Sequence, residues 1–168
     1  GRNITGRAIL RVRGPAGTRV TLRYGELLRP DGALNPLTAV CGQIKRPGLG
    51  GPGAPDVAVQ TDEYILKGEG HEVWAPQFTF HGFRYVEVTG YPGRPGPDDV
   101  CAETLHTDLE WSGFFTCSND LFVRIRDLVR RTFQNNILGV QSDCPHREKF
   151  GYGGDIVAAG EMGMFNFD

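Results

Sequence analysis

The sequence predicts a mainly β protein: an antiparallel, jelly-roll-like β-sandwich over residues 1–117, followed by helices over residues 118–168. Three observations predict this fold class. Short stretches in which apolar and polar residues alternate recur along residues 1–117. The chain of 168 residues contains 24 glycines and 11 prolines, which is typical of a sheet protein with many turns. At Ser118 the apolar residues change from a spacing of two to the spacing of an amphipathic helix.

The first two strands are expected over 7–13 and 18–24, where apolar residues alternate with arginines and other polar residues. Because the sequence Gly-Pro-Ala-Gly at 14–17 lies between them, we predict that they form a β-hairpin. Further strands are expected over 61–67, 73–79, 82–89, 101–106 and 110–116. About seven short strands with frequent turns favour a sandwich.

The segment 37–58 is rich in glycine and proline, and we predict a flexible surface loop there. It does not resemble a phosphate-binding loop, because no Gly-Lys-Ser/Thr follows the glycines.

Two helices are expected in the last part of the chain. Ser118 or Asn119 can cap the first through a side-chain oxygen, and we expect this helix to end near Leu138, before Gly139. The second is expected over 155–167. The change of period therefore predicts a domain boundary between residues 117 and 118.

The composition argues against several classes of protein. With 18 basic and 20 acidic residues, the formal net charge of −2 argues against a nucleic-acid-binding surface. Since no run of 18 apolar residues occurs, no transmembrane helix and no membrane partner are expected. The cysteines lie far apart, so we expect buried or free thiols, with no metal site and no cofactor. They are Cys41, Cys101, Cys117 and Cys144.

Both ends of the chain are expected to be cut. The first residue is Gly1 and no signal peptide follows it, while Asp168 comes directly after an apolar helical stretch. We therefore expect an excerpt of a longer protein. Its localisation stays unknown without the true N-terminus, although free cysteines favour the cytoplasm.

The loop between the two expected helices holds most of the chemistry. Asp143, Glu148 and Asp155 place three carboxylates close together in sequence, with Arg147 and Tyr152 between them. Proline and glycines shape the loop, so that the acidic groups can converge. Converging carboxylates can perform acid–base work on a glycosidic bond, an arginine can hold sugar hydroxyls, and an aromatic ring can stack on a sugar.

A structural explanation of the same loop remains open. The acids can pair with Arg147 and Lys149, and Asp155 can cap the second helix. On residue types alone this structural explanation is the better one.

The segment 141–155, which contains Asp-Cys-Pro-His-Arg-Glu-Lys, resembles the signature of the bacterial α-L-rhamnosidases, glycoside hydrolase family 78. The resemblance covers essentially the whole chain. Similar motifs are GPAGT at 14–18, ELL at 26–28, PDG at 30–32, TDEYIL at 61–66, FTFHGFRYVEV at 78–88 and HTD at 106–108.

The resemblance implies a β-sandwich followed by an (α/α)6 barrel, truncated here after its first helices, that hydrolyses terminal α-L-rhamnosides with inversion. It implies that Glu148 is the general acid, that Asp143 and Asp155 bind rhamnose hydroxyls, and that Arg147 contacts the substrate. Tyr152 stands where many members carry tryptophan, which preserves a stacking surface. His81 and Arg84, within the 78–88 motif, are expected to be core or interface residues.

The family's general base is a glutamate from a later part of the barrel, and nothing marks Glu161 as that base. We therefore expect this chain to carry the acid without the base and to be inactive alone. Its partners are expected to be a rhamnose-containing glycoside and the remainder of the barrel, and its apolar helix stripes are expected to drive self-association into a homo-oligomer. Two alternatives remain: a non-catalytic carbohydrate-binding or scaffolding sandwich, and a glycosidase of this fold that acts on another sugar.

Overall fold

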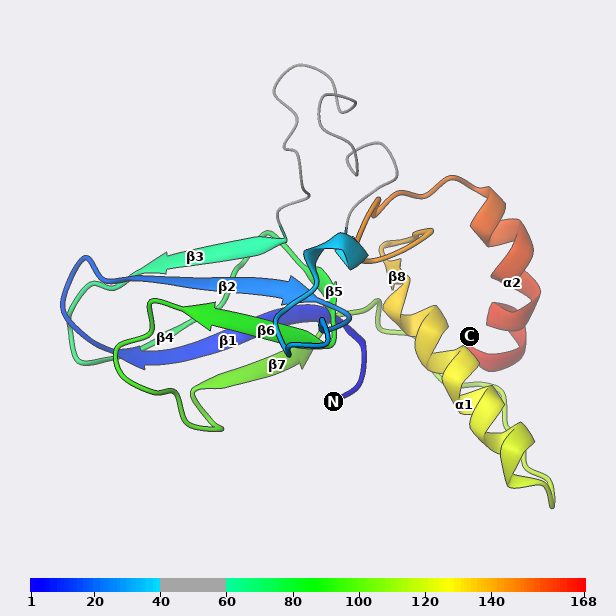
Figure 1. Cartoon of the computed structure of the whole chain (residues 1–168). Helices are drawn as coiled ribbons and strands as arrows, with labels where there is room; N and C mark the ends of the chain where they lie inside the picture. The colour runs from blue at the N-terminus through cyan, green and yellow to red at the C-terminus, as the bar shows by residue number, and fades with distance from the viewer. Residues whose placement is uncertain (40–59) are drawn as a thin grey trace. The chain divides into compact units, whose positions relative to one another are not determined.

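The computed structural model describes residues 1–39 and 60–168, and these form two compact units, Gly1–Thr104 and Leu105–Asp168 (Figure 1). The predicted boundary between residues 117 and 118 lies within the second unit. The segment before it is tied to the helical part by backbone hydrogen bonds, from Thr107 N–H to Ile137 C=O and from Asp168 N–H to Glu110 C=O. The predicted loop over 37–58 lies outside the described residues, except that 37–39 belong to the 3-10 helix η1 (Pro36–Ala39).

The first unit is built from two antiparallel sheets, which confirms the predicted class of a mainly β protein followed by helices. In one sheet β1 pairs with β4 and with β5, and β7 pairs with β1 along the edge opposite these two strands. Its strands are β1 (Ile4–Arg13), β4 (His71–Trp74), β5 (His81–Phe83) and β7 (Val100–Thr104). The other sheet has the order β3-β2-β6. Its strands are β2 (Arg19–Gly25), β3 (Thr61–Ile65) and β6 (Tyr85–Thr89).

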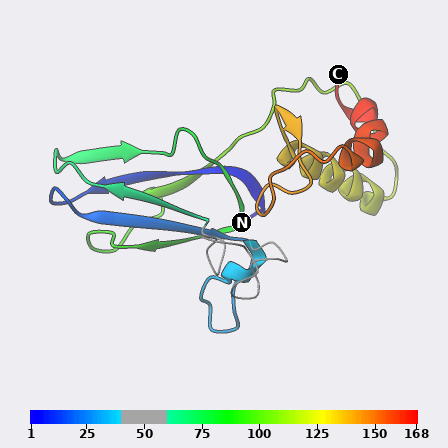
Figure 2. The same cartoon turned by 90° about the horizontal axis from the view of Figure 1, so that it is seen from above.

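The core lies between the two sheets, and β1 and β2 supply most of its buried side chains. Both views show these two long strands running along the length of the unit (Figure 1, Figure 2). Alternation places every second side chain of each strand on the inner face. These side chains are at most 2% exposed, and they are Ala8, Leu10, Val12, Val20, Leu22 and Tyr24. The same alternation predicted both strands from the sequence.

The predicted hairpin of 7–13 with 18–24 is wrong, because β1 and β2 belong to different sheets. The turn at 14–17 passes the chain from one sheet to the other, and the N–H of Gly17 donates to the C=O of Leu66 at 2.8 Å. Alternation specifies which face of a strand is buried but not which strand lies beside it. Here the two inner faces meet across the sandwich.

Other predicted strands also differ from the structure. The stretch 82–89 is divided between β5 in one sheet and β6 in the other, with Arg84 at the crossing. The stretch 110–116 is not a strand, and within it Trp111 forms only an isolated bridge with Phe167. The strand predicted over 73–79 ends at Trp74, the last residue of β4, because Pro76 lacks the backbone N–H that a β ladder needs.

His81 is a core residue of the first unit. Its ring stacks on Tyr24 with centroids 4.0 Å apart, and its nitrogens lie 2.8 Å from Gln60 Oε1 and 3.0 Å from Asp62 Oδ2. Burial, followed by the charge of Asp62, raises the pKa of the Tyr24 hydroxyl above its ordinary value. The cluster is therefore a buried polar network of the sandwich.

The second unit contains α1 (Asp120–Asn135), a hairpin of β8 (Ile137–Leu138) with β9 (Val140–Gln141), and α2 (Gly154–Asn166). Asn119 caps α1 as predicted, since its Oδ1 accepts from the N–H of Leu121 at 3.0 Å. Gly139 does not end the helix. It sits in the hairpin turn with φ 75°, a conformation that glycine adopts readily.

Aromatic side chains pack the ends of the two helices together. Phe133 of α1 stacks on Phe167, which follows α2, with centroids 5.4 Å apart. The guanidinium of Arg130, only 4% exposed, lies over the ring of Trp111. In the part of the chain that the structure describes, neither helix combines the length and hydrophobicity needed to cross a membrane.

Candidate active site

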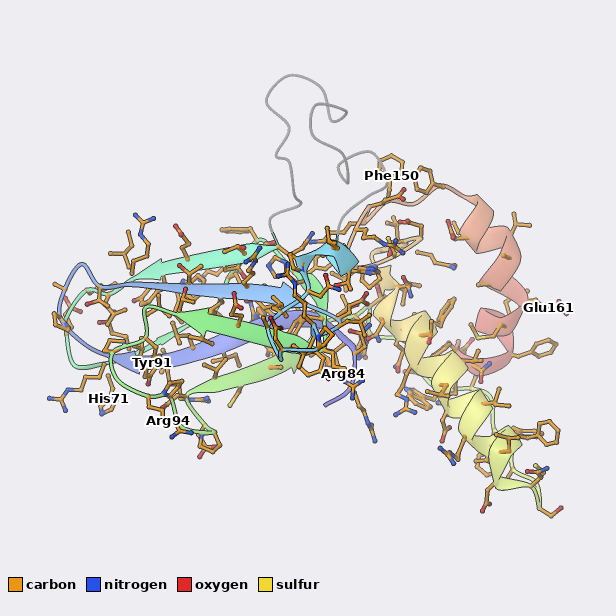
Figure 3. The ribbon with its side chains drawn as sticks, viewed as in Figure 1. His71, Arg84, Tyr91, Arg94, Phe150 and Glu161 are labelled. Carbon is orange, nitrogen blue, oxygen red and sulfur yellow. The ribbon has the colours of Figure 1, made fainter. Side chains whose placement is uncertain are left out.

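The candidate site is the loop 142–153, which joins the β8–β9 hairpin to α2. Figure 3 shows Phe150 in this loop and Glu161 on α2, with the Glu161 side chain directed away from α1. The hairpin fixes the start of the loop, because the N–H of Ser142 donates to the C=O of Asn136 at 2.7 Å. The first turn of α2 fixes its end.

Asp143 organises the loop through both carboxylate oxygens. Its Oδ1 accepts from the backbone N–H of Phe150 at 3.2 Å, and its Oδ2 accepts from the thiol of Cys144 at 3.0 Å. Partial burial acts to raise the pKa of Asp143, but the hydrogen bonds from the Cys144 thiol and from nearby backbone N–H groups outweigh it and lower the pKa. Asp143 is therefore an ionised hydrogen-bond acceptor.

Cys144 connects Asp143 to the segment that carries Glu148. Its sulfur accepts from the backbone N–H of Glu148 at 3.3 Å while its S–H donates to Asp143. Sequence reasoning treated Cys144 only as a buried or free thiol and missed this role. Its position directly after Asp143, four residues before Glu148, is the signal that was available.

Glu148 and Tyr152 are joined directly, since the Tyr152 hydroxyl donates a hydrogen bond to Oε2 of Glu148. The Tyr152 ring also lies beside that of Phe150, with centroids 4.9 Å apart and a tilt of 47° between the planes. Between Glu148 and Tyr152 in the chain, Lys149 takes φ 55°, in the left-handed region that non-glycine residues rarely occupy. This backbone conformation returns the chain so that the tyrosine meets the glutamate.

Asp143 and Asp155 line a cavity of about 340 Å³ between α1, the β8–β9 hairpin and α2. The side-chain amide of Gln141 donates to the backbone C=O of Asp155 at 3.0 Å, which ties the start of α2 to the hairpin. Asp155 is not the helix cap, because Gly153 occupies that position and makes no side-chain cap bond. Asp155 therefore lies in the first turn of α2 and on the cavity wall.

The structure therefore brings the predicted residues together in two groups. Asp143 and Asp155 share the cavity, and Glu148 contacts Tyr152, with Cys144 connecting the two groups. Arg147 is exposed beside Glu148. No cluster of three or more histidine, cysteine, aspartate or glutamate side chains suited to a metal ion occurs within residues 1–39 and 60–168.

Comparison with known proteins identifies the family. Residues 1–106 match the bacterial α-L-rhamnosidase concanavalin-like domain, and residues 110–168 match the bacterial α-L-rhamnosidase 6 hairpin glycosidase domain. The chain belongs to the bacterial α-L-rhamnosidases, glycoside hydrolase family 78. The resemblance seen in the sequence motifs is confirmed.

Individual rhamnosidases match most of the chain. It is 38% identical over 157 residues to an α-L-rhamnosidase of Streptomyces avermitilis, covering 93% of this chain and 14% of that protein. It is 42% identical over 122 residues to one of Formosa agariphila, covering 73% of this chain and 13% of that protein. The chain thus spans only a small part of the length of the curated relatives it matches.

Solved structures agree with the observed fold. The α-L-rhamnosidase of Dictyoglumus thermophilum matches with a TM-score of 0.82 and 37% identity, over 99% of this chain and 17% of that one. The S. avermitilis α-L-rhamnosidase, solved in complex with L-rhamnose, matches with a TM-score of 0.81 and 36% identity, over 99% of this chain and 15% of that one. The chain therefore has the fold found over the matching part of these rhamnosidases.

Proposed function

We propose that this chain is the sandwich and the first barrel helices of a longer inverting glycoside hydrolase that releases terminal α-L-rhamnose from rhamnosides. The family match of both segments supports the sugar and the reaction class. The observation that carries the proposal for the site is the single loop that connects Glu148 to Asp143, which shares a cavity with Asp155. The remaining barrel is the partner that completes the pocket.

In this proposal Glu148 is the general acid that protonates the departing glycosidic oxygen. Asp143 and Asp155 accept hydrogen bonds from rhamnose hydroxyls, and the lowered pKa of Asp143 supports an acceptor role. Arg147 contacts the substrate, and Tyr152, which is 59% exposed, offers a ring for stacking on the sugar. No cofactor is needed for this chemistry.

An inverting mechanism requires a second carboxylate about 6.5–9.5 Å from the acid to activate water. The only glutamate in α2 is Glu161, and its side chain points away from α1 (Figure 3). We assign the base to the rest of the enzyme, so the 168-residue chain alone should be inactive.

The test is hydrolysis of p-nitrophenyl α-L-rhamnoside by the full-length gene product and by the isolated chain, with p-nitrophenyl glucoside and galactoside as sugar controls. We expect the full-length protein to cleave the rhamnoside and the chain to match the blank. Proton NMR of the first product should show the β anomer, as inversion requires. Activity confined to another sugar would contradict the proposed substrate, and binding without hydrolysis would favour a carbohydrate-binding module.

Self-association of the isolated chain is part of the same proposal. Val157, Met164 and Phe165 on α2 are 87%, 75% and 69% exposed, and such apolar surface drives association. Sedimentation at tens of micromolar should show oligomers, and a clean monomer would count against this expectation.

A further inference from the structure

The hydrogen bond from Tyr152 to Glu148 distinguishes the two oxygens of the glutamate. The phenol hydroxyl donates to Oε2. A carboxyl oxygen that accepts from a neighbouring donor is poorly placed to carry the proton itself. The bond therefore leaves Oε1 as the oxygen that can hold a transferable proton.

The surrounding loop holds the two residues in register. The N–H of Lys149 donates to the C=O of Cys144 at 3.1 Å, and the N–H of Phe150 donates to Asp143. These backbone bonds fix the chain between Glu148 and Tyr152, and the Phe150 ring lies beside that of Tyr152. The contact is thus built into a closed turn of chain.

We propose that Tyr152 is a positioning residue for the general acid, holding Oε2 so that Oε1 delivers the proton to the leaving oxygen. The inference rests on the proposed function of Glu148. As the bond from the anomeric carbon to the glycosidic oxygen breaks, its electron pair goes to that oxygen, which takes the proton from Oε1. Water forms the new bond to the anomeric carbon and gives its proton to the second carboxylate.

The hydrogen bond from Tyr152 strengthens during this step. The carboxyl group of Glu148 becomes a carboxylate as it loses its proton, and a hydrogen bond to an ionised acceptor is stronger than one to a neutral acceptor. Because the gain appears as the proton is transferred, it lowers the barrier without tightening substrate binding. A loss of the hydroxyl should therefore appear in kcat and leave KM unchanged.

The experiment uses the full-length protein with Tyr152→Phe, which removes the hydroxyl and keeps the ring. The matched control is Phe150→Leu, which removes the neighbouring ring and leaves the hydrogen bond. Two substrates are compared: methyl α-L-rhamnoside, whose leaving group needs protonation, and p-nitrophenyl α-L-rhamnoside, whose leaving group needs little. For Tyr152→Phe we expect kcat to fall roughly tenfold on the methyl glycoside and under about threefold on the aryl glycoside.

The ratio of the two rates is the decisive quantity, because it does not depend on the fraction of enzyme that is folded. Phe150→Leu should leave this ratio unchanged, and Glu148→Gln should change it strongly. If Glu148→Gln changes the ratio and Tyr152→Phe does not, the role of Tyr152 is refuted while that of Glu148 stands. If Glu148→Gln leaves the ratio at its parental value, the general-acid assignment fails and the inference fails with it.

Discussion

Gly163 lies where α2 packs against α1, and replacing it tests this contact. A Cβ at this position would sit 2.8 Å from Cζ and 3.2 Å from Cε2 of Phe133. The Phe133 ring is 9% exposed and stacks on Phe167, so it has little room to move. Gly160 provides a matched control in the same helix, because a Cβ there would meet nothing within 4 Å.

The two alanine variants should have opposite effects. Gly160→Ala gains only the helix propensity of alanine, about 0.5–1 kcal/mol of stabilisation. Gly163→Ala gains the same amount but crowds a packed ring, which costs about 1–3 kcal/mol. The difference between the variants, about 1–3 kcal/mol, therefore measures the helix contact alone.

Native-state hydrogen exchange of peptides covering 154–168 in the full-length protein gives the opening free energy of α2 for each variant. In a Phe133→Leu background, Gly163→Ala should cost much less than it does in the parent, since the end of the ring is then absent. Equal stabilisation by both alanines would refute the packing of α1 against α2, and with it the cavity that Asp143 and Asp155 line.

Three further predictions concern the core and the loop. Leu22→Ala, at a fully buried position, should destabilise the sandwich by about 2–5 kcal/mol in hydrogen exchange of β2, whereas Val73→Ala, at 67% exposed, should cost under about 1 kcal/mol. Hydrogen bonds to Glu72, first that from the backbone N–H of Lys67, lower the pKa of its carboxyl group. The Glu72 carboxylate therefore stabilises the fold above its unfolded-state pKa, and this stabilisation is lost as the pH falls through the folded-state pKa. Glu72→Gln should accordingly lower the urea midpoint at neutral pH and have a smaller effect in acid. Asp143→Asn cannot keep both of its accepted bonds, and kcat/KM of the full-length protein should fall by at least about tenfold in steady-state assays.

The sequence predicted the individual strands and helices better than it predicted which of them lie side by side. Alternation revealed the buried faces of β1 and β2, and the side chain of Asn119 revealed the start of α1. The same alternation could not show that the turn at 14–17 joins two sheets, because both a hairpin and a sandwich satisfy it. Gly139 was misread as a helix end, since a glycine with positive φ suits a hairpin turn equally well.

The candidate site was predictable in its members but not in its contacts. One loop was expected to hold Asp143 and Glu148, and it does. The roles of Cys144 and of the Tyr152 hydroxyl depend on hydrogen bonds across a turn. That turn contains Lys149 in a left-handed conformation, which residue type does not indicate.

The most direct test of the account is the rate of Glu148→Gln in the full-length protein on a rhamnoside with a poor leaving group, beside Glu161→Gln as an exposed glutamate control. Removal of a general acid should lower kcat/KM on the methyl glycoside by about a hundredfold or more, with a smaller loss on the aryl glycoside. Glu161→Gln should retain the parental rate on both. Parental rates for Glu148→Gln on the methyl glycoside would contradict the assignment of this loop as the acid half of a rhamnosidase active site.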